Sequence, residues 1–150
     1  MPERGVGEGS SQGRVLGLDL GEVRIGVAIS DPDRTVALPA GTIRVSGGVE
    51  DLKAVAALVK ETEATEVVVG HPRQLSGERG PAAMRAEEFA EGLRMMLRVP
   101  VHLHDERLTT VEAERGLKEA GTSGPRRREV VDQAAATVIL RSWLAGPRPA

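Results

Sequence analysis

Residues 15–29 read VLGLDLGEVRIGVAI, two short runs of apolar and branched residues on either side of a Gly-Glu pair at 21–22. Two runs of this length with two turn residues between them are typical of a β-hairpin, so we expect strands over 15–20 and 23–29. A third run over 36–45 contains a proline and a glycine, which predicts an interrupted strand or one at the edge of a sheet. Together the three runs predict an antiparallel meander at the start of the fold.

The remainder of the chain alternates between helical and strand patterns. Leu52, Val55, Ala56 and Val59 recur every three or four residues, which predicts a helix over 49–62. Short apolar runs predict strands over 67–69 and 99–103, and helices are expected over 81–97, 109–120 and 124–144. Strands joined by a helix are normally parallel, with right-handed crossovers. The sequence therefore predicts an α/β fold, a five-stranded mixed sheet with helices on its faces. The core-facing residues expected in the helix over 81–97 are Met84, Phe89, Leu93, Met96 and Leu97.

The composition is that of one ordinary globular domain. The chain has 150 residues, of which 40% are hydrophobic and 28% are charged, which argues against wholesale disorder and fibrous architectures. We expect the domain to span residues 14–144, between flexible tails over 1–13 and 145–150. No stretch approaches the roughly 20 apolar residues of a membrane span, and no signal-peptide core is present. We therefore expect a cytoplasmic protein that has no membrane partner.

The residue types that are scarce also restrict the chemistry. The chain has no cysteine, which excludes disulfides, thiolate catalysis and thiolate-bound zinc. One phenylalanine, one tryptophan and no tyrosine leave little material for stacking several bases, so we expect nucleic acid to be bound mainly through its backbone.

The net charge of −2 is unevenly distributed along the chain. Residues 115–150 carry 7 basic and 3 acidic side chains, whereas residues 1–114 carry 13 basic and 19 acidic ones. The basic end includes Arg126, Arg127 and Arg128 in a row. These arginines are either an ordinary solvated helix start or a contact for phosphate groups.

Acidic side chains occur at three places where the surrounding sequence is apolar. Asp19 lies inside the first expected strand, Asp105 and Glu106 follow the strand over 99–103, and Asp132 lies in an apolar stretch of the last helix. A charge in such a place is costly unless it is paired, hydrogen-bonded or bound to a metal ion. Each acid alone also has an ordinary explanation, as a turn acceptor, a loop residue or a solvent-facing position.

Taken together, these acids are the ligands that a hard cation needs. Mg²⁺ and Mn²⁺ prefer carboxylate oxygens, and ligands gather at the carboxyl ends of parallel strands. Two such ions activate a water molecule and stabilise the leaving oxygen of a phosphodiester, so that no nucleophilic side chain is required. The pattern therefore indicates metal-dependent phosphoryl transfer.

Four motifs follow one another along the chain. They are GLDLG (17–21) with RIGVAISD (24–31), VVVG (67–70), DERLTT (105–110), and DQAAA (132–136) with Ile139-Leu140. In this order they resemble the YqgF family of pre-16S rRNA nucleases, also described as Holliday junction resolvase-like proteins, over essentially the whole domain. The resemblance implies a ribonuclease H-like fold and a metal-dependent endonuclease that helps to mature the 5′ end of small-subunit ribosomal RNA.

The resemblance also implies roles for individual residues. The acidic triad of the family falls on Asp19, Glu106 and Asp132, with Mg²⁺ or Mn²⁺ as the metal. Arg107 and Thr109 or Thr110 are the accompanying groups on the substrate side. One segment departs from the family pattern, because residues 70–77 read GHPRQLSG where the family has a Gly-Leu-Pro-like turn. His71 thus replaces an apolar residue beside the expected site, and we expect it to be a packed or solvated turn residue.

Three functions remain open from the sequence. The favoured one is hydrolysis of structured RNA, with Arg126, Arg127 and Arg128 on substrate phosphates and ribosomal assembly particles as partners. The second is resolution of a DNA junction, which calls for a symmetric homodimer, whereas the first allows a monomer. The third is a catalytically silent module that docks on nucleic acid, which the three acids disfavour because added negative charge weakens phosphate binding. The chain is too short for the two domains of a sugar kinase or an actin-like ATPase.

Overall fold

The structure is a computed structural model that describes residues 12–74, 76–108 and 124–146, with the backbone alone for 108 and 124–127. The predicted helix over 109–120 and most of the two predicted tails lie outside these residues. The elements in chain order are β1 (Val15–Leu20), β2 (Arg24–Ser30), β3 (Ala37–Arg44), α1 (Val49–Thr62), β4 (Glu66–His71), α2 (Pro81–Met96), β5 (Val101–Asp105), the 3-10 turn η2 (Glu106–Leu108) and α4 (Gly124–Ala145).

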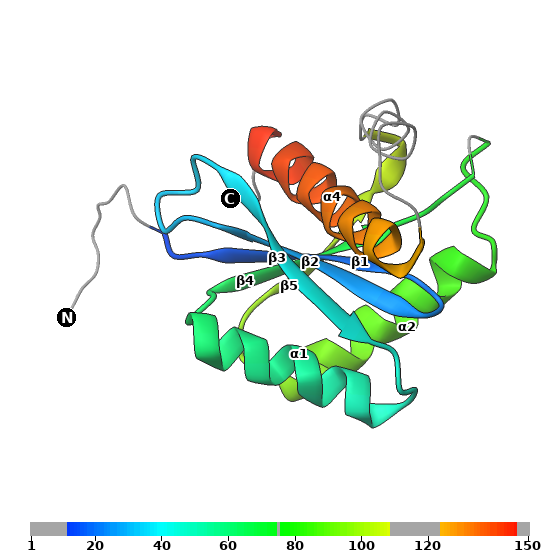
Figure 1. Cartoon of the computed structure of the whole chain (residues 1–150), viewed down its shortest axis with the longest axis horizontal. Helices are drawn as coiled ribbons and strands as arrows, with labels where there is room; N and C mark the ends of the chain where they lie inside the picture. Colours follow the sequence, from blue (N-terminus) through cyan, green and yellow to red (C-terminus); the bar gives the residue numbers. More distant parts are fainter. Residues whose placement is uncertain (1–11, 75, 109–123, 147–150) are drawn as a thin grey trace.

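The first strand lies at the centre of a five-stranded sheet of order β3-β2-β1-β4-β5 (Figure 1). The pairs β1–β2 and β2–β3 are antiparallel, whereas β1–β4 and β4–β5 are parallel. The predicted mixed sheet with its meander is therefore confirmed. Since β1, β4 and β5 all end on the same side, their last residues meet at what we call the carboxyl end of the sheet, where ligands bind in folds of this kind.

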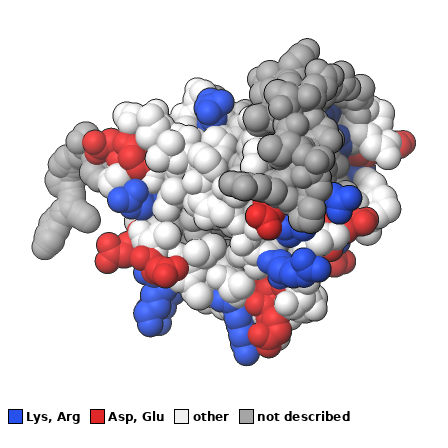
Figure 2. Space-filling model, viewed as in Figure 1, with Lys and Arg blue, Asp and Glu red and all other residues white. Residues whose placement is uncertain are grey.

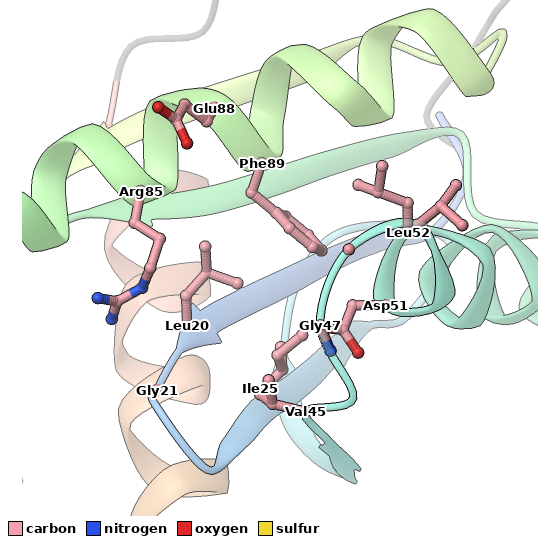
Figure 3. Close-up of a pocket in the computed structure, with 12 residues that line it drawn as sticks. Leu20, Gly21, Ile25, Val45, Gly47, Asp51, Leu52, Arg85, Glu88 and Phe89 are labelled. Carbon is pink, nitrogen blue, oxygen red and sulfur yellow. The ribbon is translucent and has the colours of Figure 1, made fainter.

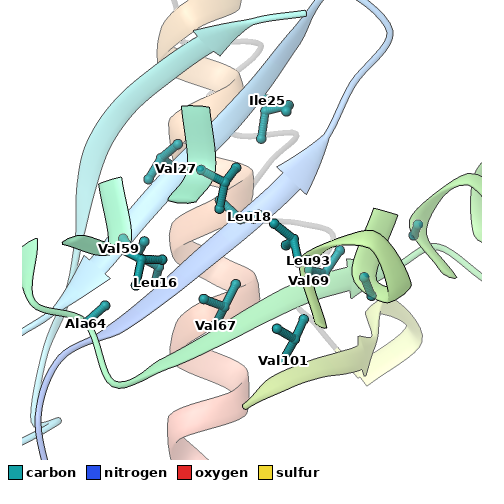
Figure 4. Packing of buried hydrophobic residues seen from close by; sticks show 13 residues of the cluster. Leu16, Leu18, Ile25, Val27, Val59, Ala64, Val67, Val69, Leu93 and Val101 are labelled. Carbon is teal, nitrogen blue, oxygen red and sulfur yellow. The ribbon is translucent and has the colours of Figure 1, made fainter. Parts of the chain in front are cut away.

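Helices cover both faces of the sheet. Leu16 and Leu18 of β1 are fully buried in a cluster with residues of α1 and α2 (Figure 4). Val15, the residue before Leu16, belongs to a second cluster, on the opposite face, with residues of α4 such as Leu140 and Trp143. This division follows from the alternation of side chains along a strand, and it assigns every residue of β1 to one helical layer.

The helix α4 lies unusually close to the two central strands. A Cβ atom built on Gly17 of β1 would lie 2.8 Å from the Cβ atom of Leu140, and one built on Gly26 of β2 would lie 2.6 Å from the carbonyl carbon of Asp132. Neither distance is possible for a real side chain, so the absence of a side chain at these two strand positions allows α4 to approach the sheet. This approach brings Asp132 to the carboxyl end of the sheet.

Two details of the prediction were wrong. The last strand runs over Val101–Asp105 rather than 99–103, because Pro100 has no N–H to donate to a ladder. In α2, Met84 and Met96 are not core residues, since their relative exposures are 47% and 39%. The buried residues of α2 are Leu93, as predicted, and three alanines, whose small side chains let the helix approach the sheet: Ala83, Ala86 and Ala90. None of the helices in the described part of the chain is long and apolar enough to cross a membrane.

Candidate active site

The half-buried Asp19 lies one residue before the end of β1, on the face that α4 covers. Its register partner on β2 is Gly26. On the other side, β4 pairs Val69 with Leu18, so that the next residue, Gly70, lies beside Asp19. Both neighbours of Asp19 in the sheet therefore lack a side chain, and other groups can approach its carboxylate from both sides.

Glu106 occupies the space above Gly70. It follows β5 directly, as the first residue of η2. A Cβ atom on Gly70 would lie 2.6 Å from Oε2 of Glu106 and 2.6 Å from Cδ1 of Ile139, a residue of α4. The Glu106 carboxylate therefore lies on the α4 face of the sheet, next to the strand position that flanks Asp19.

Asp132 reaches the same region from α4, on the side of Gly26. Its backbone lies directly over Gly26, and its carboxylate is held by Arg24, the first residue of β2. Nε of Arg24 donates a hydrogen bond of 2.9 Å to Oδ2 of Asp132, and the two side chains are only 11% and 28% exposed. This ion pair fixes the orientation of the Asp132 carboxylate relative to the sheet.

The three acids predicted to form the site thus lie around the end of β1: Glu106 has its carboxylate over Gly70, and Asp132 has its backbone over Gly26. Carboxylate oxygens without sulfur ligands suit Mg²⁺ or Mn²⁺, so the types of donor fit the implied metal. Within the described ranges, however, no group of three or more His, Asp or Glu side chains lies close enough to hold an ion. One of the three acids, Asp132, is engaged by an arginine instead.

The neighbouring Asp105 is separated from these three acids. It is the last residue of β5, and alternation places its side chain with Val101 and Leu103 on the α1–α2 face. Arg107 donates to it from Nε (3.1 and 3.0 Å) and from Nη2 (2.7 Å), and the backbone N–H of Arg107 donates as well (2.9 Å). These bonds from Arg107 lower the pKa of Asp105 to about 2, and the carboxylate in turn raises the pKa of the Arg107 guanidinium.

Comparison with known proteins identifies the family of the chain. The model of the RuvX family, described as Holliday junction resolvase, matches residues 13–146. The chain belongs to the RuvX family. The membership predicted from the four motifs is thereby confirmed, since the YqgF-like motifs and the RuvX match cover the same domain.

Two curated relatives carry the name "Putative pre-16S rRNA nuclease". The protein of Mycobacterium ulcerans (strain Agy99) is 49% identical over 141 residues, which cover 93% of this chain and 83% of the relative. The protein of Mycobacterium tuberculosis (strain H37Rv) is 51% identical over 134 residues, which cover 89% of this chain and 79% of the relative.

A solved structure is similar to the RuvX-family chain in fold. Thermus thermophilus RuvC in complex with a Holliday junction substrate superposes with a TM-score of 0.50 and 14% identity, over 88% of this chain and 93% of that one. Similarity at this level of identity concerns the architecture alone. It confirms the predicted ribonuclease H-like fold.

The structure shows His71, the departure from the RuvX-family pattern, as a packed residue, which is one of the two alternatives expected for it. His71 is the last residue of β4 and points toward α2, away from the face on which Glu106 lies. Its Nε2 lies 2.7 Å from Oε2 of Glu87, and Nε of Arg79 lies 2.8 Å from the same oxygen. The hydrogen bond from His71 is the main cause that lowers the pKa of Glu87. His71 therefore links the end of β4 to α2, and it does not lie among the three acids.

The remaining substrate-side candidates are described only in part. Arg128 is exposed on α4, four residues before Asp132. Thr109 and Thr110, and the side chains of Arg126 and Arg127, lie outside the described part of the chain. Among the coloured residues of the face in Figure 2, acidic and basic side chains are interspersed.

Sequence reasoning assigned no role to Arg24 or Gly70. The role of Arg24 depends on a partner 108 residues away, and the role of Gly70 depends on the packing of Glu106 and Ile139. The only local signal for either residue was its place in a motif, RIGVAISD for Arg24 and VVVG for Gly70.

Proposed function

We propose that this chain is a divalent-metal-dependent endonuclease that hydrolyses phosphodiester bonds in structured RNA. Its role would be maturation of the 5′ end of the small-subunit rRNA precursor, in the cytoplasm and in contact with ribosomal assembly particles. The observation that carries the proposal is the place of Asp19 between two glycines, with Glu106 over Gly70 and Asp132 over Gly26. The names of the curated relatives support the choice of substrate.

In this proposal, Asp19, Glu106 and Asp132 hold one or two Mg²⁺ or Mn²⁺ ions. When bound, such ions lower the pKa of an attacking water molecule and stabilise the leaving oxygen. The protein contributes three carboxylates at one end of the sheet, and the two glycines beside Asp19 allow Glu106 and Asp132 to approach the strands. Arg24 occupies Oδ2 of Asp132 and so holds the other oxygen in a fixed direction.

Basic and hydroxyl groups would bind the substrate backbone around these acids. Arg107 follows Glu106 and stays charged, since its pKa is raised, and Arg128 is exposed one helical turn before Asp132. We include Arg126 and Arg127 in this group because of their position in sequence. Thr109 and Thr110 complete it, as hydroxyl donors to a phosphate.

A second candidate function is resolution of a four-way DNA junction. It is favoured by the description of the RuvX family model and by the fold shared with a RuvC that was solved with a Holliday junction. The same three acids would serve, but a symmetric homodimer would be needed to present two such sites to the junction. RNA maturation places no such demand on the oligomeric state, and a monomer suffices.

The test compares both substrates under the same conditions. Purified protein is incubated with a transcript that carries the 5′ leader of the small-subunit rRNA and, separately, with a synthetic four-way DNA junction. Each reaction is run with Mg²⁺, with Mn²⁺ and with chelator. Asp19→Asn is the inactive variant, and Asp33→Asn, at an exposed aspartate in the β2–β3 loop, is the matched control.

We expect metal-dependent cleavage of the RNA by the wild type and by Asp33→Asn, and none by Asp19→Asn. Cleavage of the junction alone would replace the RNA proposal with the second candidate. Undiminished cleavage by highly purified Asp19→Asn would remove Asp19 from the site.

A further inference from the structure

A cavity of about 470 Å³ lies on the opposite face of the sheet from Asp19. It is enclosed by the β1–β2 turn, the loop before α1, and α2 (Figure 3). Apolar side chains form its walls, among them Leu20, Leu52 and Phe89. Its volume falls within the range of sites that bind small molecules or parts of larger ones.

The wall formed by the loop before α1 is held in place by a buried aspartate. Oδ1 of Asp51 accepts a hydrogen bond of 2.8 Å from the backbone N–H of Ser46, and Oδ2 accepts one of 2.9 Å from that of Gly47. Asp51 is only 7% exposed. The cavity is therefore shaped before any ligand arrives, which lowers the cost of binding.

The cavity opens at the same end of the sheet as the candidate active site. Leu20, which lines it, directly follows Asp19 in β1, and successive residues of a strand point to opposite faces. Gly21, the first residue of the turn, also lines the cavity. A nucleic-acid strand with a phosphate at Asp19 would reach the mouth of this cavity by crossing the β1–β2 turn.

The side chains of the cavity suit a flat aromatic group attached to an anion. Phe89 is the only phenylalanine of the chain, and it points into the cavity between Leu20 and Leu52 (Figure 3). Arg85, one helical turn before Phe89, extends toward Leu20 and Gly21. Arg85 forms no ion pair with any side chain that the structure describes. The lining also includes the acidic Glu88. An aromatic wall with Arg85 at the mouth still matches a nucleotide better than a purely apolar ligand.

We propose that this cavity is a subsite for one unpaired nucleobase of the substrate. The base stacks on Phe89, and Arg85 pairs with the adjoining phosphate. The proposal rests on the nuclease function proposed above, and it adds a preference for a nucleotide that is unpaired near the cut. A single aromatic pocket also agrees with an aromatic content too low for a platform that stacks several bases.

The first experiment detects binding without cleavage. Amide and methyl NMR spectra of the wild-type protein are recorded during titration with AMP, GMP, CMP and UMP, and with ribose 5-phosphate, which lacks a base. We expect the nucleotides to shift the signals of Leu20, Gly47 and Leu52, whereas ribose 5-phosphate leaves them in place. Toluene serves as the probe for a purely apolar site.

Two tryptophan variants localise the binding. Val49→Trp fills the cavity from its wall at the start of α1, where Val49 is 49% exposed. Met95→Trp adds the same side chain at an 85% exposed position of α2 outside the cavity. We expect Val49→Trp to weaken nucleotide binding by about ten-fold to a hundred-fold, as loss of one stacked base would, and Met95→Trp to leave it unchanged.

The second experiment links the cavity to cleavage. The leader transcript is prepared with a single abasic residue at each position around the cut. We expect the wild type to cleave one of these substrates at least ten-fold more slowly than the others, and Val49→Trp to cleave them all at similar reduced rates.

Several results would overturn the proposal. Equal shifts with ribose 5-phosphate would show a phosphate contact alone, and shifts with toluene but with none of the nucleotides would show a site for another kind of ligand. RNA cleavage without nucleotide shifts at the cavity would refute the subsite and leave the nuclease function standing. Nucleotide shifts at the cavity in a protein that cleaves no RNA would uphold nucleotide binding there and refute the nuclease function instead.

Discussion

Replacement of Gly26 by alanine perturbs the contact that places Asp132 beside Asp19. The new methyl group would lie 2.6 Å from the carbonyl carbon of Asp132 and closer still to its oxygen. Carbon atoms in contact are normally about 3.5–4.0 Å apart, so α4 has to move away from β2 by about 1 Å. The clashing atoms belong to the backbone, and no change of rotamer can relieve them.

The cost follows from two opposing contributions. Forcing an extra methyl group into a packed interior costs about 1–3 kcal/mol, and the upper part of this range applies because a whole helix has to shift. Alanine in place of glycine recovers about 0.5–1 kcal/mol in a strand. The net loss of unfolding free energy is about 2 kcal/mol, which corresponds to a melting temperature about 4–8 °C lower.

Trp143 provides the assay. It is the only tryptophan, the chain has no tyrosine, and its side chain lies on α4 with 8% exposure, so its fluorescence reports directly on the packing of this helix. Urea unfolding is followed at this signal for wild type and Gly26→Ala. Gly146→Ala is the matched control, because a Cβ atom there would meet its nearest neighbour at an ordinary 3.7 Å.

The reasoning would be refuted if Gly26→Ala unfolded within about 0.3 kcal/mol of wild type, as surface substitutions do. It would also fail if the variant were destabilised but cleaved RNA at the full wild-type rate well below its melting temperature. In that case the distance between α4 and the sheet would not govern the site.

Two further predictions concern the neighbours of these residues. Gly70→Ala should lower cleavage at least ten-fold with only a modest loss of stability. The reason is that its new methyl group would lie 2.6 Å from the carboxylate of Glu106, which can move aside. Unchanged cleavage would show that the position of Glu106 is unimportant. Asp105, with a folded pKa lowered to about 2 by Arg107, should stabilise the protein above pH 4 and lose this effect as the pH falls toward 2. Carboxyl NMR of Arg107→Gln should show the pKa of Asp105 rising toward 3.8, and an unshifted titration would count against the bond from Arg107.

Parts of the fold could be predicted because local patterns determine them. The hairpin over residues 15–29 could be predicted from its apolar runs on either side of a two-residue turn. In α2 the same kind of reasoning was wrong about Met84 and Met96, because hydrophobicity alone does not show where a helix needs small side chains to approach a sheet. Ala86 and Ala90 fill that role, and their spacing was as visible in the sequence as that of the methionines.

In the candidate active site, too, residues could be predicted only where the local sequence carries the signal. The cost of placing a charge among apolar residues pointed to Asp19 and Asp132 without any knowledge of the fold. The contribution of Arg24 could not be predicted in this way, since its partner lies 108 residues further along the chain. His71 was expected to be packed or solvated, and it is packed, but its partner Glu87 could not be predicted because it lies 16 residues further along the chain.

Calorimetric titration with Mn²⁺ tests most directly whether the three acids form one metal-dependent site. The titration is run on wild type, Asp19→Asn, Glu106→Gln and Asp132→Asn, with Asp105→Asn as control because Asp105 adjoins Glu106 yet is bound by Arg107. We predict that the wild type and Asp105→Asn bind Mn²⁺ with similar affinity, and that each of the other three variants binds at least ten-fold more weakly. Equal affinity in all five proteins, or no binding by the wild type, would contradict the account.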